Sequence, residues 1–147
     1  MSILNLKIQV VTPLLFGLFI GPPLMAEVAH DPSGCPDLTG RFEIPDPIFP
    51  PMKINITSAI DIKGVPTLSI INEESKDEDF VELDGQFKGD AAGGVTGLCN
   101  GQTIYIFEYD QGKQSSLGRL SLNSDRNLLM EVESAGESPI SSIGYRQ

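Results

Sequence analysis

Two cysteines and one histidine are the residues of this 147-residue sequence best suited to nucleophilic or metal chemistry. They are Cys35, Cys99 and His30. A cysteine or serine nucleophile needs a base that the fold holds beside it, and His30 lies ahead of every expected strand. A zinc tetrahedron needs more ligands than two thiolates without a partner. We therefore expect no enzyme, no catalytic residue, no cofactor and no metal centre in this chain.

The cysteine pair favours a structural role instead. An even number of cysteines in an oxidising compartment is typical of an intramolecular disulfide. We predict a bridge between Cys35 and Cys99, with 63 residues of chain between them. Such a bridge ties the N-terminal segment to the strand that ends at Asn100-Gly101.

Carboxylates are the other abundant reactive groups. The chain has 20 Asp and Glu against 10 Lys and Arg, for a net charge of −10. An acidic protein repels phosphate, so we expect no nucleic-acid partner. The charge is also expected to keep the protein soluble and monomeric.

The acidic segment over residues 73–79 is a candidate calcium loop, because carboxylate oxygens are the ligands that calcium prefers. The segment lacks the regular spacing and the turning glycine of a known calcium loop, and Lys76 lies within it. We expect a solvated loop and keep calcium binding as the weaker alternative. Its candidate ligands are Glu73, Glu74, Asp77 and Asp79.

The first residues have the pattern of an export signal. Lys7 is the only charge before an apolar run over residues 10–20, and Gly21-Pro22-Pro23-Leu24-Met25-Ala26 follows. This pattern is typical of a secretory signal peptide (residues 1–26). A membrane-spanning helix needs about 20 apolar residues, and this run is shorter. We predict cleavage after Ala26, a secreted or periplasmic protein and no membrane span after cleavage. An uncleaved anchor, or lipidation at Cys35, is the alternative.

The elements that must position these groups are predicted to be β-strands. After a tail over residues 27–37, apolar and polar residues alternate with the period of two that marks a strand. Four prolines between 45 and 51 interrupt the pattern, and Asn100-Gly101 predicts a two-residue hairpin turn that pairs Cys99 with Gln102. Strands are expected over 38–44, 52–62, 67–71, 81–87, 95–99, 102–109, 118–122, 128–133 and 143–145.

These eight to nine short strands predict a single all-β domain over residues 38–147, arranged as an antiparallel meander. A meander has two free edges unless its first and last strands pair. We therefore expect closure into a small barrel, with a β-sandwich as the alternative.

The alternation also predicts which side chains point inward. The candidate interior is dominated by branched aliphatic side chains, which favours a low, largely filled barrel with at most a small pocket. Its members are Phe42, Ile54, Ile56, Ile60, Ile62, Leu68, Ile70, Leu120, Leu122, Met130 and Val132.

Three aromatic residues leave two interpretations open. Tyr105, Phe107 and Tyr109 share one face of their strand, while Ile104 and Ile106 share the other. The aromatic side chains are either core or an exposed strip suited to contact with a sugar or a protein.

The opening of the domain resembles a known group of proteins. Cys35-Pro36-Asp37-Leu38-Thr39-Gly40-Arg41-Phe42 is similar to the first strand of small secreted bacterial lipocalin-like proteins, and the hairpin that begins at Gly118 is similar to theirs. The resemblance covers about twenty residues and implies a calycin-type up-and-down barrel that holds an apolar ligand. Phe42 stands where lipocalins usually have tryptophan.

Two functions are consistent with these features. The first is a secreted or periplasmic interaction protein that uses its outer face or its loops. The second is a lipocalin-like carrier of a small apolar molecule. The expected partner is accordingly a protein, a glycan or a small apolar ligand.

Overall fold

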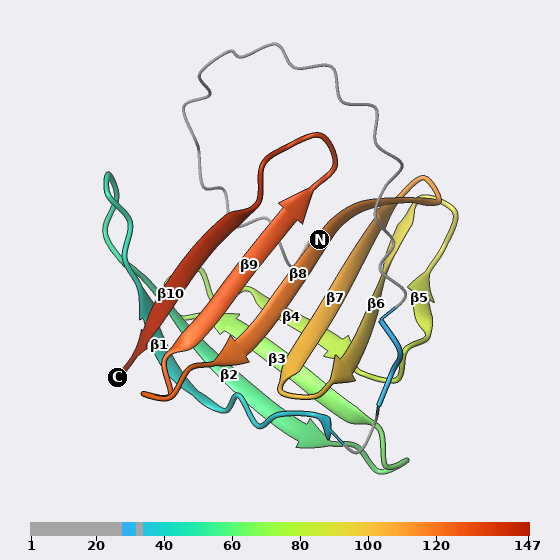
Figure 1. The fold of residues 1–147 in the computed structure, drawn as a ribbon, viewed down its shortest axis with the longest axis horizontal. Helices are drawn as coiled ribbons and strands as arrows, with labels where there is room; N and C mark the ends of the chain where they lie inside the picture. The colour runs from blue at the N-terminus through green and yellow to red at the C-terminus, as the bar shows by residue number, and fades with distance from the viewer. Residues whose placement is uncertain (1–27, 32–33) are drawn as a thin grey trace.

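The computed structural model describes residues 28–31 and 34–147, and its regular secondary structure is almost entirely β-strand (Figure 1). The predicted signal peptide lies outside the described residues. The described residues contain no apolar helix of the length that spans a bilayer. The ten strands are β1 (Gly40–Ile44), β2 (Met52–Ile60), β3 (Pro66–Asn72), β4 (Glu78–Glu82), β5 (Phe87–Gly89), β6 (Gly93–Asn100), β7 (Thr103–Asp110), β8 (Lys113–Leu122), β9 (Leu128–Ser134) and β10 (Ile140–Arg146).

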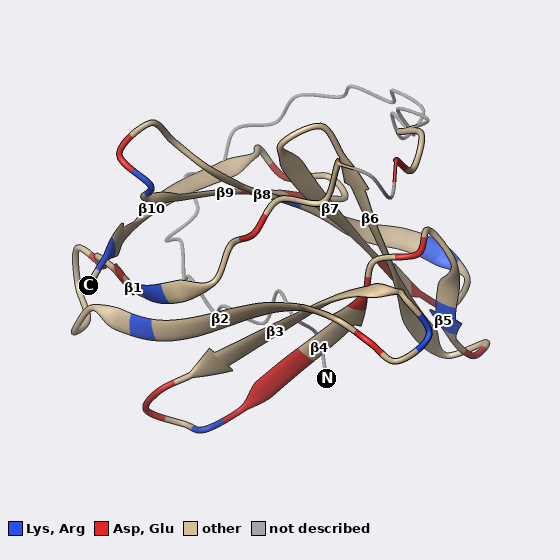
Figure 2. Ribbon diagram, turned by 90° about the horizontal axis from the view of Figure 1, so that it is seen from below, with Lys and Arg blue, Asp and Glu red and all other residues tan. Residues whose placement is uncertain are grey.

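All ten strands belong to one antiparallel sheet with the order β4-β3-β2-β1-β10-β9-β8-β7-β6-β5. The first and last strands pair, with Phe42 opposite Arg146 and Glu43 opposite Tyr145. The predicted all-β meander and the pairing of its two ends are thus confirmed. The sheet curls into a half-barrel, in which β1 to β4 face β6 to β9 across a shared interior (Figure 2).

The sheet remains open between β4 and β5, where a single strand over 81–87 was expected. The structure divides this segment into two strands at opposite edges of the sheet. The chain turns between them at Gly85, whose φ is +73°, a conformation that favours glycine. The Leu83 N–H donates to Pro66 O at 2.7 Å, while the Gly85 N–H donates to Gly97 O at 2.9 Å. The division raises the strand count from eight or nine to ten.

The β6–β7 hairpin differs from prediction by two residues of register. Cys99 pairs with Ile104 rather than with Gln102, and Asn100 pairs with Thr103. The turn therefore consists of Gly101 and Gln102, and only the glycine has positive φ, at +59°. A shift of two residues keeps every side chain on its predicted face, because strand side chains alternate with a period of two.

The core lies on the concave face of the sheet and includes most of the predicted interior. Five of the predicted residues are buried, and three more pack against the core while partly buried. Val132 is half-buried. The five buried residues are Phe42, Ile54, Ile56, Leu68 and Leu120, and the three partly buried ones are Ile70, Leu122 and Met130.

The prediction was wrong for Ile60 and Ile62, which are both exposed. The ladder between β1 and β2 ends at the Gly40–Ile56 pair, so the hairpin beyond Ile56 extends past the strand that would cover it. β2 itself ends at Ile60, and Ile62 lies in the turn. Alternation continues in the sequence after the strand has left the core.

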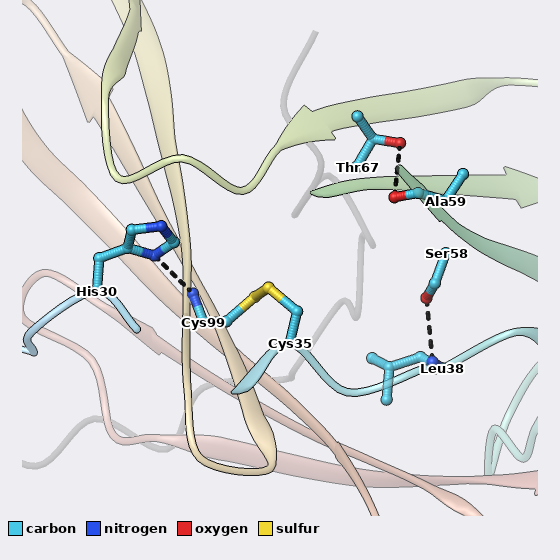
Figure 3. The surroundings of a disulfide bond; sticks show 7 residues. All are labelled: His30, Cys35, Leu38, Ser58, Ala59, Thr67 and Cys99. Atoms are coloured by element: carbon cyan, nitrogen blue, oxygen red, sulfur yellow. Dashed lines mark hydrogen bonds between the residues drawn. A yellow bond between two sulfur atoms is a disulfide. The ribbon is translucent and has the colours of Figure 1, made fainter. Parts of the chain in front are cut away.

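A disulfide and a set of polar contacts cover one end of the half-barrel (Figure 3). Cys35 and Cys99 are bonded as predicted, with their Cα atoms 5.0 Å apart. Leu38 is fully buried, and its N–H donates to Ser58 Oγ at 3.0 Å. The Arg146 guanidinium lies over the Phe42 ring, 4.9 Å from its centroid.

The two halves of the sheet approach each other across the open side at Gly97. A Cβ atom at this position would overlap the Val81 side chain and lie 2.7 Å from Glu82 O. Glycine therefore allows β4 to lean on β6. Lys88 of β5 adds ion pairs across the opening, to Glu82 at 2.7 Å and to Asp84 at 2.8 Å. We call this boundary, formed by β4, β5 and Gly97, the seam.

Candidate functional site

The histidine lies in a structural contact beside the disulfide. The Cys99 N–H donates to His30 Nδ1 at 3.4 Å, and the Asp31 N–H donates to Cys99 O at 2.8 Å. The Asn100 side chain donates to Ala29 O at 2.8 Å. The segment expected to be a simple polar tail is therefore bonded to the edge of β6, and the acceptor nitrogen of His30 is occupied by a backbone amide (Figure 3).

The acidic segment over 72–79 does not gather its carboxylates into one site. Glu73 forms a two-pronged ion pair with Arg41, with nitrogen–oxygen distances of 2.6 and 2.8 Å, and the hydrogen bond with this guanidinium lowers the pKa of Glu73. Asp79 lies on β4, opposite Ile70. Among the described residues, no three His, Cys, Asp or Glu side chains lie close enough together to hold a metal. The calcium alternative therefore has no geometric support there.

Asp79 instead joins Glu108 on the concave face. Their opposite strand partners, Ile70 and Val95, both pack against the core. Glu108 is buried and accepts a hydrogen bond from Ser116 Oγ at 2.7 Å. Burial, followed by the charge of Glu108, raises the pKa of Asp79. The arrangement presents acidic groups beside apolar side chains, as suits the positively charged end of an apolar molecule.

The aromatic strip lies on the outer face, the second of the two interpretations, but it is packed rather than exposed. Phe107 is only 7% exposed and lies in a cluster with Leu98 and Leu117, against which Tyr105 and Tyr109 pack while partly buried. Val28 also packs on the cluster, and the Phe87 ring meets the Tyr109 ring edge-on at 5.5 Å. These side chains form a second small core outside the sheet.

Exposed apolar side chains gather instead on the outer face of β9 and β10. Ile143 and Leu129 are opposite partners in the ladder, and Tyr145 follows Ile143 on the same face. All three are exposed. We call Leu129, Ile143 and Tyr145 the outer patch. Its sequence signal was the pair Ile143 and Tyr145, which a single glycine, Gly144, separates.

The loop over residues 45–51 presents two further apolar side chains, Ile48 and Phe49, which are both exposed. The carboxylate of Asp46 accepts hydrogen bonds from the N–H groups of Ile48 and Phe49, each at 2.8 Å. These bonds lower the pKa of Asp46, the bond from Phe49 most. Four prolines restrict the same loop, so its apolar tip is held in a defined shape before any partner binds. The loop follows β1, the strand that neighbours β10.

No protein-family model, curated protein or solved structure matches this chain.

Proposed function

We propose that this is an exported, non-enzymatic binding module whose outer patch contacts a partner protein. The observation that carries the proposal is the exposure of Leu129, Ile143 and Tyr145 side by side on two adjacent strands. Exposed apolar groups that are contiguous, unlike single ones, are typical of interaction sites, and tyrosine is enriched where partners bind.

The surroundings of the patch support this assignment. Next to it on the outer face, Arg119 lies between Glu131 and Glu133 and pairs with both. An apolar centre with a charged border is the usual anatomy of a protein interface. The loop over 45–51 leaves the sheet from the adjacent strand and offers Ile48 and Phe49 as further contacts.

Export is supported by the disulfide, because such bonds persist in oxidising compartments and are rare in the cytosol. The leader over residues 1–26 has the pattern of a signal peptide. We propose a secreted or periplasmic protein.

Site-specific crosslinking tests the outer patch. A photoreactive benzoylphenylalanine at Ile143 should crosslink to one discrete protein in an extract of the source cells. The same group at Thr57, an exposed position on the outer face of β2, serves as the control and should not. Tyr145→Ala should weaken the crosslink from position 143. Equal products from both positions, or no product from position 143, would overturn the proposal.

A lipocalin-like carrier is the second candidate, and the concave face favours it in one respect. Ile70, Val95 and Met130 pack against the core but are only partly buried, and Asp79 and Glu108 lie beside the first two. Such a lining suits a small apolar molecule with an amine.

Incubation with a lipid extract, followed by mass spectrometry of what co-purifies, separates the two candidates. A carrier should retain a defined apolar amine, and Asp79→Asn should release it. Retention of nothing specific, together with a crosslink from position 143, would leave the binding module alone.

A further inference from the structure

The open edge of β4 suggests a second binding surface, separate from the outer patch. We propose that β4 accepts an extended, positively charged peptide segment as an additional antiparallel strand. The proposal rests on the backbone of β4, on its exposed phenylalanine and on its charge.

Hydrogen bonds at both ends of β4 show which of its residues bond to β3. The Leu83 N–H donates to Pro66 O at 2.7 Å, and the Asn72 N–H donates to Asp77 O at 3.0 Å. Both pairs continue the β3–β4 register, in which Leu68 is opposite Val81. Hydrogen-bonded pairs alternate with non-bonded pairs in an antiparallel ladder, so Asp79 and Val81 bond to β3.

The backbone groups of Glu78, Phe80 and Glu82 therefore point away from β3. Glu82 O is covered, because it approaches Gly97. In the described residues, no ladder joins β4 to any strand other than β3. The N–H and C=O groups of Glu78 and Phe80 are thus available to pair with another chain, as in recognition by strand addition.

The side chains beside this edge define the partner. Phe80 is 57% exposed and lies on the outer face between Glu78 and Glu82, while Asp79 points to the concave face. Three of the five residues of β4 are acidic and none is basic (Figure 2). Directly opposite cross-strand pairs of unlike charge are favourable. The matching strand therefore carries Lys or Arg opposite Glu78 and Glu82, four residues apart, with an apolar residue midway between them opposite Phe80.

A second copy of this chain does not meet that requirement. Two β4 edges paired antiparallel about Phe80 would place Glu78 of one copy opposite Glu82 of the other. Like charges directly opposite each other destabilise a sheet. Charged, short edge strands also deter unwanted pairing in many proteins, and a basic strand is the partner that this charge does not repel.

A peptide titration on the oxidised protein tests the proposal. The probe is acetyl-Lys-Thr-Val-Thr-Lys-amide, which places Val opposite Phe80 and Lys opposite Glu78 and Glu82, and the control is its counterpart with Glu in place of Lys. By NMR, the Lys peptide should shift the amide signals of Glu78 and Phe80 and slow their hydrogen exchange. The Glu peptide should do neither. Equal binding of the two peptides, or shifts confined to other strands, would overturn the proposal.

Two variants at one position separate the backbone from the side chain. Phe80→Ala removes the ring and keeps the edge N–H, whereas Phe80→Pro removes both. Proline is tolerated where a strand N–H faces outward, so both variants should keep the β3–β4 ladder. We expect Phe80→Pro to bind the Lys peptide at least tenfold more weakly than Phe80→Ala. Equal affinities would contradict strand addition.

If Phe80→Pro does not fold, N-methylated versions of the Lys peptide test strand addition on the unaltered protein. N-methylation of alternate residues blocks one edge of the peptide at a time. One alternate set should abolish binding to the unaltered protein, and the other should leave it unchanged. Loss with both sets or with neither would reject the added strand, as would dimerisation of the protein alone through the β4 edge in sedimentation.

Discussion

Gly97 shows how much the contact across the seam depends on one missing side chain. Val81 and Glu82 occupy the space that a Cβ atom would take, and the latter contact is with backbone, which cannot rotate away. Gly97→Ala should therefore destabilise the protein by about 1 to 3 kcal/mol, the usual cost of overpacking. Urea unfolding measures this. Gly93→Ala is the control, because its Cβ would meet only Tyr109 O, at 3.0 Å. Equal losses in both variants would mean that the seam is not closely packed.

The contribution of Asp79 to stability should fall as the pH rises, which is the opposite of the usual behaviour of a carboxylate. Its pKa is raised, first by burial and then by Glu108, so between the unfolded and the folded pKa the native state binds more protons than the unfolded state. Stability contributed by Asp79 therefore falls as the pH rises through this interval. Asp79→Asn should be more stable than the parent at pH 7 and equal to it at pH 3. Denaturant midpoints at the two values measure the difference, with exposed Asp125→Asn as the control.

Other carboxylates act in the opposite direction. The pKa of Asp46 is lowered by backbone hydrogen bonds, and the pKa of Glu73 is lowered by its bond with Arg41. Their stabilisation is present above the ordinary carboxyl pKa and is lost as the pH falls through the lowered values.

The Asp79 prediction has a clear contrary outcome. A stability profile of Asp79→Asn that kept the parent's shape between pH 4 and 7 would contradict the environment assigned to Asp79.

Residue-scale prediction from the sequence succeeded where local pattern suffices. The disulfide followed from the cysteine count, and Ile56 was correctly placed inside by alternation. The contact of Gly97 with Val81 and the electrostatic effect of Glu108 on Asp79 link strands that are not neighbours in the sheet. No local spacing reports such contacts, so the sequence offered no signal for the seam or for the acidic groups beside the core.

At the scale of elements, the same substitution on the two faces of β2 should have very different consequences for stability. Ile56 is fully buried, and the next residue, Thr57, is exposed on the other face. Ile56→Asp would bury an uncompensated charge and should cost more than about 4 kcal/mol, enough to unfold the protein. Thr57→Asp should change stability by less than about 0.5 kcal/mol. Circular dichroism and thermal melts distinguish the outcomes. A folded Ile56→Asp protein would refute the assigned face of β2.

Most strands were predicted from alternation, because a sheet with one buried face imposes that period. The exceptions have physical causes. The segment over 81–87 became two strands because Gly85 turns the chain between β4 and β5. The outward position of Phe107 could not be chosen in advance, because both faces of β7 are apolar and a second small core covers the outer one.

For the whole molecule, the disulfide should be a major source of stability. It joins residues 64 apart in sequence, Cys35 and Cys99. In the chain-entropy model, a loop of that length is worth about 4 kcal/mol. Cys99→Ser should lower the melting temperature strongly, and Cys35→Ser should lower it equally. The double variant, with both cysteines replaced by serine, should match the singles, since either change removes the same bond. An unchanged melting temperature would show that the bridge adds no net stability.

The pairing of β1 with β10 also affects how fast the chain can fold. Every other ladder joins strands that are consecutive in sequence, whereas Phe42 and Arg146 are 104 residues apart. Once the disulfide has formed, the path between them is 7 residues to Cys35 and 47 from Cys99, about half as long. Halving a loop favours its closure by about 0.6 kcal/mol. The bridge therefore shortens the chain between the two strands, and the β1–β10 ladder should close about threefold faster when the oxidised chain refolds than when the reduced chain refolds.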